Sequence, residues 1–255
     1  MKRALIAIAV VLCLPIGIVV AGYAWLQSDS GRGWAAGKIE ALASTPGETE
    51  VRLGGITGNI FRDFGISNLR ISDRTGVWLT VSSAEVTWNP WDLIGGGIMV
   101  DRLALREVAV DRLPQSEPSQ DDATLAEQIE SLRDLPQIRV SALAVEPLTL
   151  GAAVLGQEAR LKVAGGMQAS GADSLQGRLQ VVRLDGVPGE ITLDARYGIE
   201  DKTLALDVTA TEPEGGLLAR ALDVPGHPAL ASALKGDGPI SEWKGHFDMS
   251  FGAAV

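Results

Sequence analysis

Alternation of apolar and polar residues is the feature that most constrains how this chain can fold. Ile191, Leu193 and Tyr197 share one side of an extended chain, and Thr, Asp and Arg residues fall between them. This period of two is typical of a β-strand that buries only one face. The same period recurs in residues 204–208 and 247–251. The sequence therefore predicts a mainly β fold built from strands that are apolar on one side.

The phase of this alternation slips by one residue in two segments. Val100 is followed by Leu103, and Val140 is likewise followed by Leu143. A β-bulge at each slip keeps the apolar residues on one face and curls the sheet. Turn-forming residues such as those at 185–189 separate the strands at spacings that suit hairpins. Because no strand alternates with a long helix, we expect an antiparallel, curled sheet with a few short helices.

The N-terminal residues indicate a membrane anchor. From Ala4 to Leu26 the chain runs for 23 residues without a charge, directly after Lys2 and Arg3. A helix of this length crosses about 30 Å of hydrocarbon, since each residue rises about 1.5 Å. The basic residues on its N-terminal side place the N-terminus in the cytoplasm and the remainder outside it. The small residues around Ala21 leave open the alternative of a cleaved signal peptide.

The pattern divides the chain into consecutive segments with different expected structures. Three of them depart from the β pattern, because they contain helix-capping residues or Pro and Gly punctuation. Asp29 or Ser30 is expected to cap the helix just outside the membrane. In the last segment, residues 215–222 and 228–234 are predicted to form short helices. The predicted segments are a transmembrane anchor (1–27), a juxtamembrane helix (28–46), a first β module (47–112), a linker with a short helix (113–136), a second β module (137–211), and short helices before the start of a further β module (212–255).

The composition argues against several classes of function. The formal net charge is −10, and beyond Lys2 and Arg3 there are 20 basic residues against 32 acidic ones. Nucleic acid is not an expected partner, because a face that binds it needs clustered Lys and Arg. Cys13, His227 and His246 supply neither a disulfide nor an ordinary zinc site. The chain also lacks a phosphate loop and a nucleophile elbow, so we expect no enzyme activity, no cofactor and no metal.

Several short motifs, in the same order along the chain, resemble those of a known family. They are residues 51–61 (VRLGGITGNIF), the stretch 66–79 with its Trp-Leu end, Trp88-Asn89-Pro90, residues 215–228 and residues 234–243. Together they resemble the N-terminal region of the TamB family, the inner-membrane subunits of the translocation and assembly module. The family's proteins are several times longer, and this chain stops at Val255 without their C-terminal domain. We therefore expect it to correspond to an N-terminal part.

The resemblance implies a location, a function and a set of partners. Family members, similar to AsmA-like and bridge-like lipid transfer proteins, hang from the inner membrane by one helix and extend a curled β-sheet across the periplasm. Its apolar groove is expected to carry phospholipid to the outer membrane, or to assist protein assembly there, as in protein secretion and autotransporter biogenesis. The implied partners are the inner membrane, phospholipid acyl chains and a TamA-like outer-membrane barrel, the last met through a C-terminal part that this chain lacks.

The residues expected to line the groove are those on the apolar side of the later strands. They are Ile191, Leu193, Tyr197, Leu204, Leu206, Val208, Phe247, Met249 and Phe251. An alternative function remains open, because alternating strands also bury their apolar face against a second sheet. In that case the protein is a closed β-sandwich that binds no lipid. It would then act as an assembly scaffold or chaperone by pairing its edge strands with client strands.

Overall fold

The structure is a computed structural model that describes residues 22–115, 137–171, 173–221 and 224–252. The anchor predicted at 1–27 lies mostly outside these residues, as does the helix predicted within 113–136. Among the helices in the described residues, none combines the length and the apolar character needed to cross a membrane.

Strands make up most of the described chain, and short helices connect some of them. The strands are β1 (Glu50–Arg52), β2 (Gly55–Asn59), β3 (Asp63–Asp73), β4 (Gly76–Trp88), β5 (Gly97–Val110), β6 (Gln137–Leu150), β7 (Ala159–Ala169), β8 (Ser174–Arg183), β9 (Glu190–Gly198), β10 (Thr203–Glu212), β11 (Leu230–Asp237) and β12 (Lys244–Phe251). The helices are α2 (Asp29–Ala43), η1 (Pro90–Gly95), α4 (Ala152–Leu155), α5 (Leu217–Ala221) and η3 (Ile240–Glu242). The prediction of a mainly β fold is confirmed.

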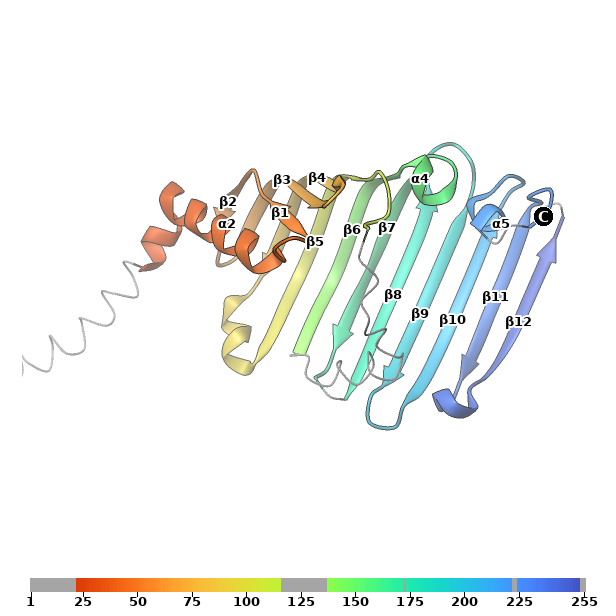
Figure 1. Cartoon of the computed structure of the whole chain (residues 1–255). Helices are drawn as coiled ribbons and strands as arrows, with labels where there is room; N and C mark the ends of the chain where they lie inside the picture. Colours follow the sequence, from red (N-terminus) through yellow and green to blue (C-terminus); the bar gives the residue numbers. More distant parts are fainter. Residues whose placement is uncertain (1–21, 116–136, 172, 222–223, 253–255) are drawn as a thin grey trace, which may run out of the picture.

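All of these strands belong to one open sheet (Figure 1). Its order is β1-β3-β4-β5-β6-β7-β8-β9-β10-β11-β12, with β2 also paired to β3. Neighbouring strands are antiparallel except β5 and β6, which are parallel. The prediction of a wholly antiparallel sheet is therefore wrong at this pair. Because residues 111–136 separate the two strands, the chain has enough length to return to the starting end of β5 before β6 begins.

The predicted bulges are confirmed. The register between β6 and β7 shifts between Val140 and Leu143, and again between Val145 and Leu148. In the parallel pair, Val100 faces Val140 and Leu103 faces Leu143, so the slips of β5 and β6 lie side by side. Matched irregularities keep the apolar residues of both strands on one face. Alternation alone could not show this alignment, since it depends on which strands pair.

The core lies on that apolar face. Val81, Val108 and Val145 are buried at its centre, on β4, β5 and β6, and leucines from the neighbouring strands pack around them. A second cluster joins Ala159 and Leu161 of β7 to Leu217 of α5. The short helices α4 and α5 therefore cover the sheet only near one end of its strands, where β6 and β10 finish and β7 begins (Figure 1).

The helix α2 begins close to its predicted start and covers the first edge of the sheet. Its N-cap is Ser28, one residue before Asp29 and two before Ser30, the two predicted caps, and the Ser28 side chain accepts a hydrogen bond from the Gly31 amide. The helix packs against β1 and β2, and Ala36 is buried at that contact. One margin of the open sheet is thus protected, whereas the far edge at β12 has no such cover among the described residues.

The prediction of a short helix at 228–234 is wrong, because most of this segment belongs to β11. Leu230 and Leu234 pair with Glu212 and Val208 of β10 on one side. On the other side they pair with Phe251 and Phe247 of β12. A helix of seven residues is marginal in water, whereas two neighbouring strands offer a full set of backbone hydrogen bonds. The predicted helix at 215–222 is present as α5.

Candidate functional site

Apolar side chains form continuous rows that run across the strands. Residues paired between neighbouring strands lie on the same face, so the pairings define each row. One row consists of Val86, Leu103, Leu143, Gly165, Leu179, Leu193, Val208, Leu234 and Phe247. The next consists of Ile56, Ile66, Ala84, Leu105, Val145, Val163, Val181, Ile191, Ala210, Ser232 and Met249. At about 4.8 Å per strand, the first row extends about 40 Å.

The nine residues predicted to line a groove all lie on this face, on β9, β10 and β12. Ile191, Leu193, Val208, Phe247 and Met249 belong to the two rows. The other four occupy neighbouring positions of the same face: Tyr197 pairs with Leu204, Leu206 pairs with Ala195, and Phe251 pairs with Leu230. The corresponding residues of β4 to β8 were not predicted as lining residues, although their alternation carries the same signal.

This face is open in the described part of the chain. All the strands there belong to a single sheet, and no strand packs on another from across the face. Most residues of the first row are half-buried, and at the last strand Phe247 is 55% exposed and Phe251 53% exposed. These apolar side chains are only partly covered by their neighbours in the sheet. An apolar molecule that lay over them would remove more of their surface from water, which is favourable.

A small apolar hollow lies beneath α5. It has a volume of about 130 Å³ and is lined mainly by Leu161, Val181, Ile191, Leu217 and Leu218. The helix is held over the sheet by the buried carboxylate of Glu212, which accepts hydrogen bonds from the amides of Leu218 (2.8 Å) and Ala219 (2.6 Å). A carboxylate at this position satisfies amides that a helix leaves without partners in its first turn.

Two polar atoms are buried on this otherwise apolar face without a hydrogen-bond partner among the described residues. They are Nη1 of Arg183 and the hydroxyl of Tyr197. The rest of the Arg183 guanidinium is paired, since its Nη2 lies 2.6 Å from Oδ2 of Asp185. This hydrogen bond lowers the pKa of the Asp185 carboxyl against the opposing effect of burial. Both unpaired atoms can donate, so each favours an oxygen of a bound molecule.

Trp243 lies against the apolar face near its last edge. Its Nε1 donates to the Leu204 carbonyl oxygen at 2.9 Å. The indole ring sits where Gly236 and Gly245 face each other, and a Cβ at either glycine would overlap it. The ring therefore occupies space that two ordinary side chains would fill, next to Leu206, which pairs with Gly236.

No family model, curated protein or solved structure matches this chain. The candidate site therefore rests on the geometry of the sheet. Its defining property is an uncovered apolar face that crosses many strands.

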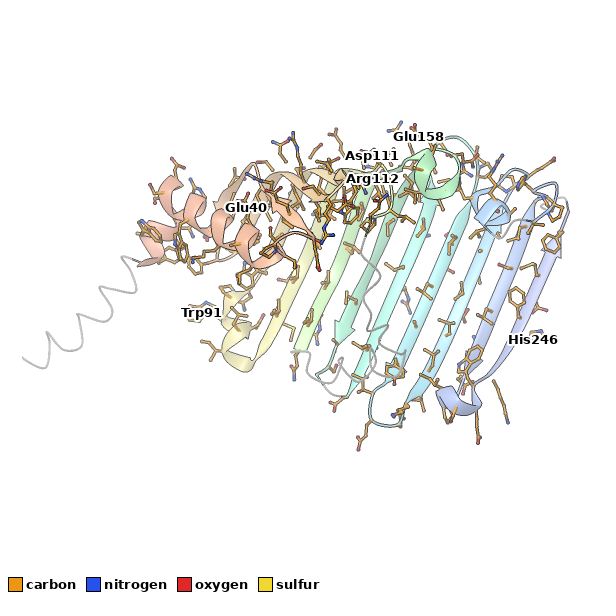
Figure 2. All side chains as sticks on the ribbon, viewed as in Figure 1. Glu40, Trp91, Asp111, Arg112, Glu158 and His246 are labelled. Atoms are coloured by element: carbon orange, nitrogen blue, oxygen red, sulfur yellow. The ribbon has the colours of Figure 1, made fainter. Side chains whose placement is uncertain are left out.

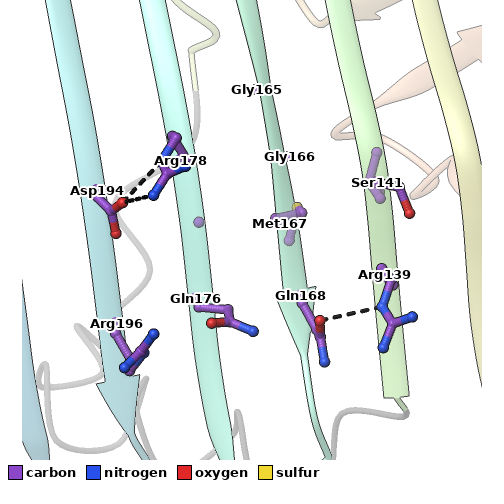
Figure 3. Close-up of a pocket in the computed structure, with 12 residues that line it drawn as sticks. Arg139, Ser141, Gly165, Gly166, Met167, Gln168, Gln176, Arg178, Asp194 and Arg196 are labelled. Carbon is purple, nitrogen blue, oxygen red and sulfur yellow. Dashed lines mark hydrogen bonds and ion pairs between the residues drawn. The ribbon is translucent and has the colours of Figure 1, made fainter.

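The opposite face is polar and carries a hollow over β6 to β9 (Figure 3). This hollow has a volume of about 430 Å³ and lies over Gly165 and Gly166. Arg139, Arg178 and Arg196 surround it: Nε of Arg139 donates to Oε1 of Gln168 at 3.2 Å, and Arg178 forms an ion pair with Asp194. These are exposed side chains on a solvated face, as the sequence predicted for the polar side of the strands.

Neither histidine belongs to a metal-binding cluster of the described residues. His246 is exposed on the polar face of β12 and lies 3.0 Å from the Asp248 carboxylate (Figure 2). His227 lies in the loop before β11 with a positive φ of 46°. In the described residues there is no cluster of three or more His, Cys, Asp or Glu side chains with the arrangement of a metal site.

Proposed function

We propose that this chain is a membrane-anchored, non-catalytic protein of the TamB type, whose apolar sheet face forms a periplasmic groove for phospholipid acyl chains. The groove serves phospholipid transport to the outer membrane or protein assembly in it. The observation that carries this proposal is the pair of apolar rows, which run unbroken by charge from β4 to β12 on an open face. Resemblance of the sequence to the TamB family supports it independently.

The direction of the rows suits a passage for lipid. On every strand from β4 to β11, at least one of the two rows presents a valine, leucine or isoleucine side chain to an acyl chain lying across the strands. The first row spans about 40 Å. Each methylene that leaves water contributes about 0.8 kcal/mol. Because successive positions in a row are chemically alike, a tail that moves from one strand to the next loses little free energy. Binding without a strong fixed site is what a conduit requires.

The N-terminal sequence supplies the anchor. The uncharged run from Ala4 to Leu26 ends where α2 and the first edge of the sheet begin. With the anchor in the inner membrane, the covered edge at β1 and β2 lies nearest the membrane and β12 lies furthest from it. Lipid would enter beside α2 and leave along β12.

Lipid crosslinking tests the groove with a matched pair of variants. Leu206 lies on the apolar face, and its neighbour Ala205 lies on the polar face, where it pairs with Arg196. We expect the full chain, purified in mild detergent, to retain phospholipid detectable by mass spectrometry and to crosslink to a phospholipid with a photoreactive tail. Leu206→Arg should abolish this crosslinking, and Ala205→Arg should preserve it. Equal crosslinking of the two variants would exclude the apolar face as the lipid site.

A second candidate function rests on the free edge of the sheet. All eight residues of β12 are exposed, and β12 pairs only with β11 in the described chain. The closed β-sandwich considered from the sequence does not fit a single open sheet, but the edge could still pair with a client strand. In that case a photoreactive residue at Ser250 should crosslink to an unfolded outer-membrane β-domain, and Leu206→Arg should leave this crosslink intact.

A further inference from the structure

Six large apolar or aromatic side chains are exposed at one corner of the sheet. Tyr23, Trp25 and Trp34 come from the start of α2 and the residues before it, and they are 45%, 46% and 52% exposed. Trp91, Leu93 and Ile94 come from η1 and are 73%, 49% and 80% exposed. We refer to these six residues as the aromatic corner. Single exposed apolar residues are ordinary, whereas a group of this size marks a contact with a partner or a membrane.

A continuous set of contacts joins the two halves of this corner. The ring of Tyr23 stacks on Phe61 at 5.0 Å, and Nε2 of Gln27 donates to Oδ1 of Asn59 at 2.6 Å. Asn59 ends β2, and Phe61 lies in the turn between β2 and β3. The same turn accepts two hydrogen bonds from Trp88, which ends β4: its Nε1 donates to the Ile60 carbonyl at 2.7 Å and its amide to the Arg62 carbonyl at 2.9 Å. The start of α2 and η1 are therefore fixed at the same corner.

The exposed tip of η1 is held rigidly rather than loosely. Asn89 caps its first turn by accepting a hydrogen bond from the Trp91 amide. Gly96 ends it in the left-handed region with φ of 79°, and its amide donates back to the Asp92 and Leu93 carbonyls. No residue of η1 is buried. Both termini of this turn are thus satisfied, and Trp91 points away from the sheet (Figure 2).

The charges beside the corner largely cancel. Arg32 pairs with Asp29 at 2.6 Å, and Arg62 lies 3.4 Å from the Asp63 carboxylate. Lys38 lies 5.9 Å from the centre of the Trp34 ring. Attraction to anionic lipid is therefore weak here, and aromatic and aliphatic contact supplies the driving force. Trp and Tyr favour the boundary between hydrocarbon and headgroups, where the ring is apolar and its N–H or O–H remains wet.

We propose that the aromatic corner is seated in the interfacial layer of a lipid bilayer, with η1 inserted as a second membrane contact beside the N-terminal anchor. The occupant is a bilayer because Tyr23 and Trp25 belong both to this corner and to the end of the uncharged run from Ala4 to Leu26. This inference rests on the proposed membrane anchoring. Two contacts fix the orientation of the sheet relative to the membrane, which one helix alone cannot do.

An environment-sensitive fluorophore tests this contact in the full chain. With Cys13→Ser as background, Leu93→Cys is labelled with the dye NBD and the protein is reconstituted into phosphatidylcholine vesicles. The matched control is Val77→Cys, which is also an exposed apolar residue, at 44% against 49% for Leu93. Val77 lies at the opposite end of β4 from η1, about 36 Å from Trp88 along the strand.

We expect the label at residue 93 to show blue-shifted emission and to be quenched by lipids that carry a nitroxide near the headgroup. The label at residue 77 should retain the emission of an aqueous dye, and replacing part of the phosphatidylcholine by phosphatidylglycerol should not change either result. If the protein floats with the vesicles while both labels remain aqueous, the corner does not contact the bilayer and the anchoring stands. If the protein does not float at all, the anchoring and the contact both fail.

Discussion

Arg112 and Asp73 form a two-point ion pair at the place where the chain leaves β5. Nη1 of Arg112 lies 2.7 Å from Oδ2 of Asp73, and Nη2 lies 2.7 Å from Oδ1. This pairing, together with a hydrogen bond from the Gln115 amide, holds the pKa of the Asp73 carboxyl well below its usual range. It also raises the pKa of Arg112. The pair fastens the first residues of the parallel crossover to the hairpin between β3 and β4.

We predict that Asp73→Asn releases this segment. An amide cannot provide two anionic oxygens to the guanidinium, so the amides of Thr75 and Gln115 should exchange faster with deuterium, as measured by mass spectrometry. Because the folded-state pKa is depressed, the contribution of Asp73 to stability is present above the unfolded pKa of about 3.9 and is lost as the pH falls below it. Protection in the unmodified protein should therefore stay constant between pH 7 and about pH 4 and decline only in stronger acid.

The control for this prediction is Asp201→Asn. Asp201 caps the hairpin between β9 and β10 by accepting a hydrogen bond from the Thr203 hydroxyl at 2.8 Å, and no arginine of the described residues pairs with it. Its replacement should leave exchange at Gln115 unchanged. Equal protection of Gln115 in Asp73→Asn and in the unmodified protein would contradict the role given to the ion pair.

The loss of stability in Val81→Ala should show how tightly the centre of the apolar face is packed. Val81 is only 3% exposed and packs in one cluster with Val108 of β5 and Val145 of β6. Removing two methyl groups there should lower the free energy of unfolding by about 2 kcal/mol. Val77→Ala, on the same strand but exposed, should change it by about 0.5 kcal/mol or less. Urea titration in detergent, followed by tryptophan fluorescence, gives both values, and similar losses for the two variants would show that the face is not packed as described.

Tyr197→Phe should not destabilise the lipid-free protein. The Tyr197 hydroxyl is buried without a partner in the described chain, so removing it relieves a desolvation cost and breaks no hydrogen bond. We expect the free energy of unfolding to be unchanged or higher, measured by the same titration. If the hydroxyl binds an oxygen of a bound lipid, the variant should also retain less phospholipid during purification. A clear loss of stability in the delipidated variant would mean that the hydroxyl has a protein partner.

Gly245→Ala should displace Trp243. A Cβ at residue 245 would overlap the indole ring, which also donates its N–H to the Leu204 carbonyl. The ring should move off the apolar face and become more accessible to iodide, measured as quenching of tryptophan fluorescence. Gly95→Ala serves as the control, since no heavy atom lies within 4 Å of a Cβ at that position. Unaltered quenching in Gly245→Ala would mean that the Trp243 ring does not lie against Gly245.

The alternation of apolar and polar residues predicted many of the strands, because this pattern lies within each strand's own sequence. The alternation in β9, β10 and β12 located their apolar side, and the slips after Val100 and Val140 located bulges that the register confirms. The same reasoning missed β11, where small residues at 231–233 weaken the alternation. It also missed the exposure of Trp91 and Ile94, because a turn sequence does not show which neighbours cover it.

What the sequence by itself determined is therefore the content of each strand: which side is apolar, where the phase slips, and where a turn must follow. Only the tertiary structure decided how these strands combine, since pairing joins residues far apart in the chain. The parallel alignment of β5 with β6, the single open sheet and the aromatic corner all depend on such pairing. Backbone hydrogen bonds between strands are the same for any sequence, so their choice of partner is settled by packing over the whole sheet.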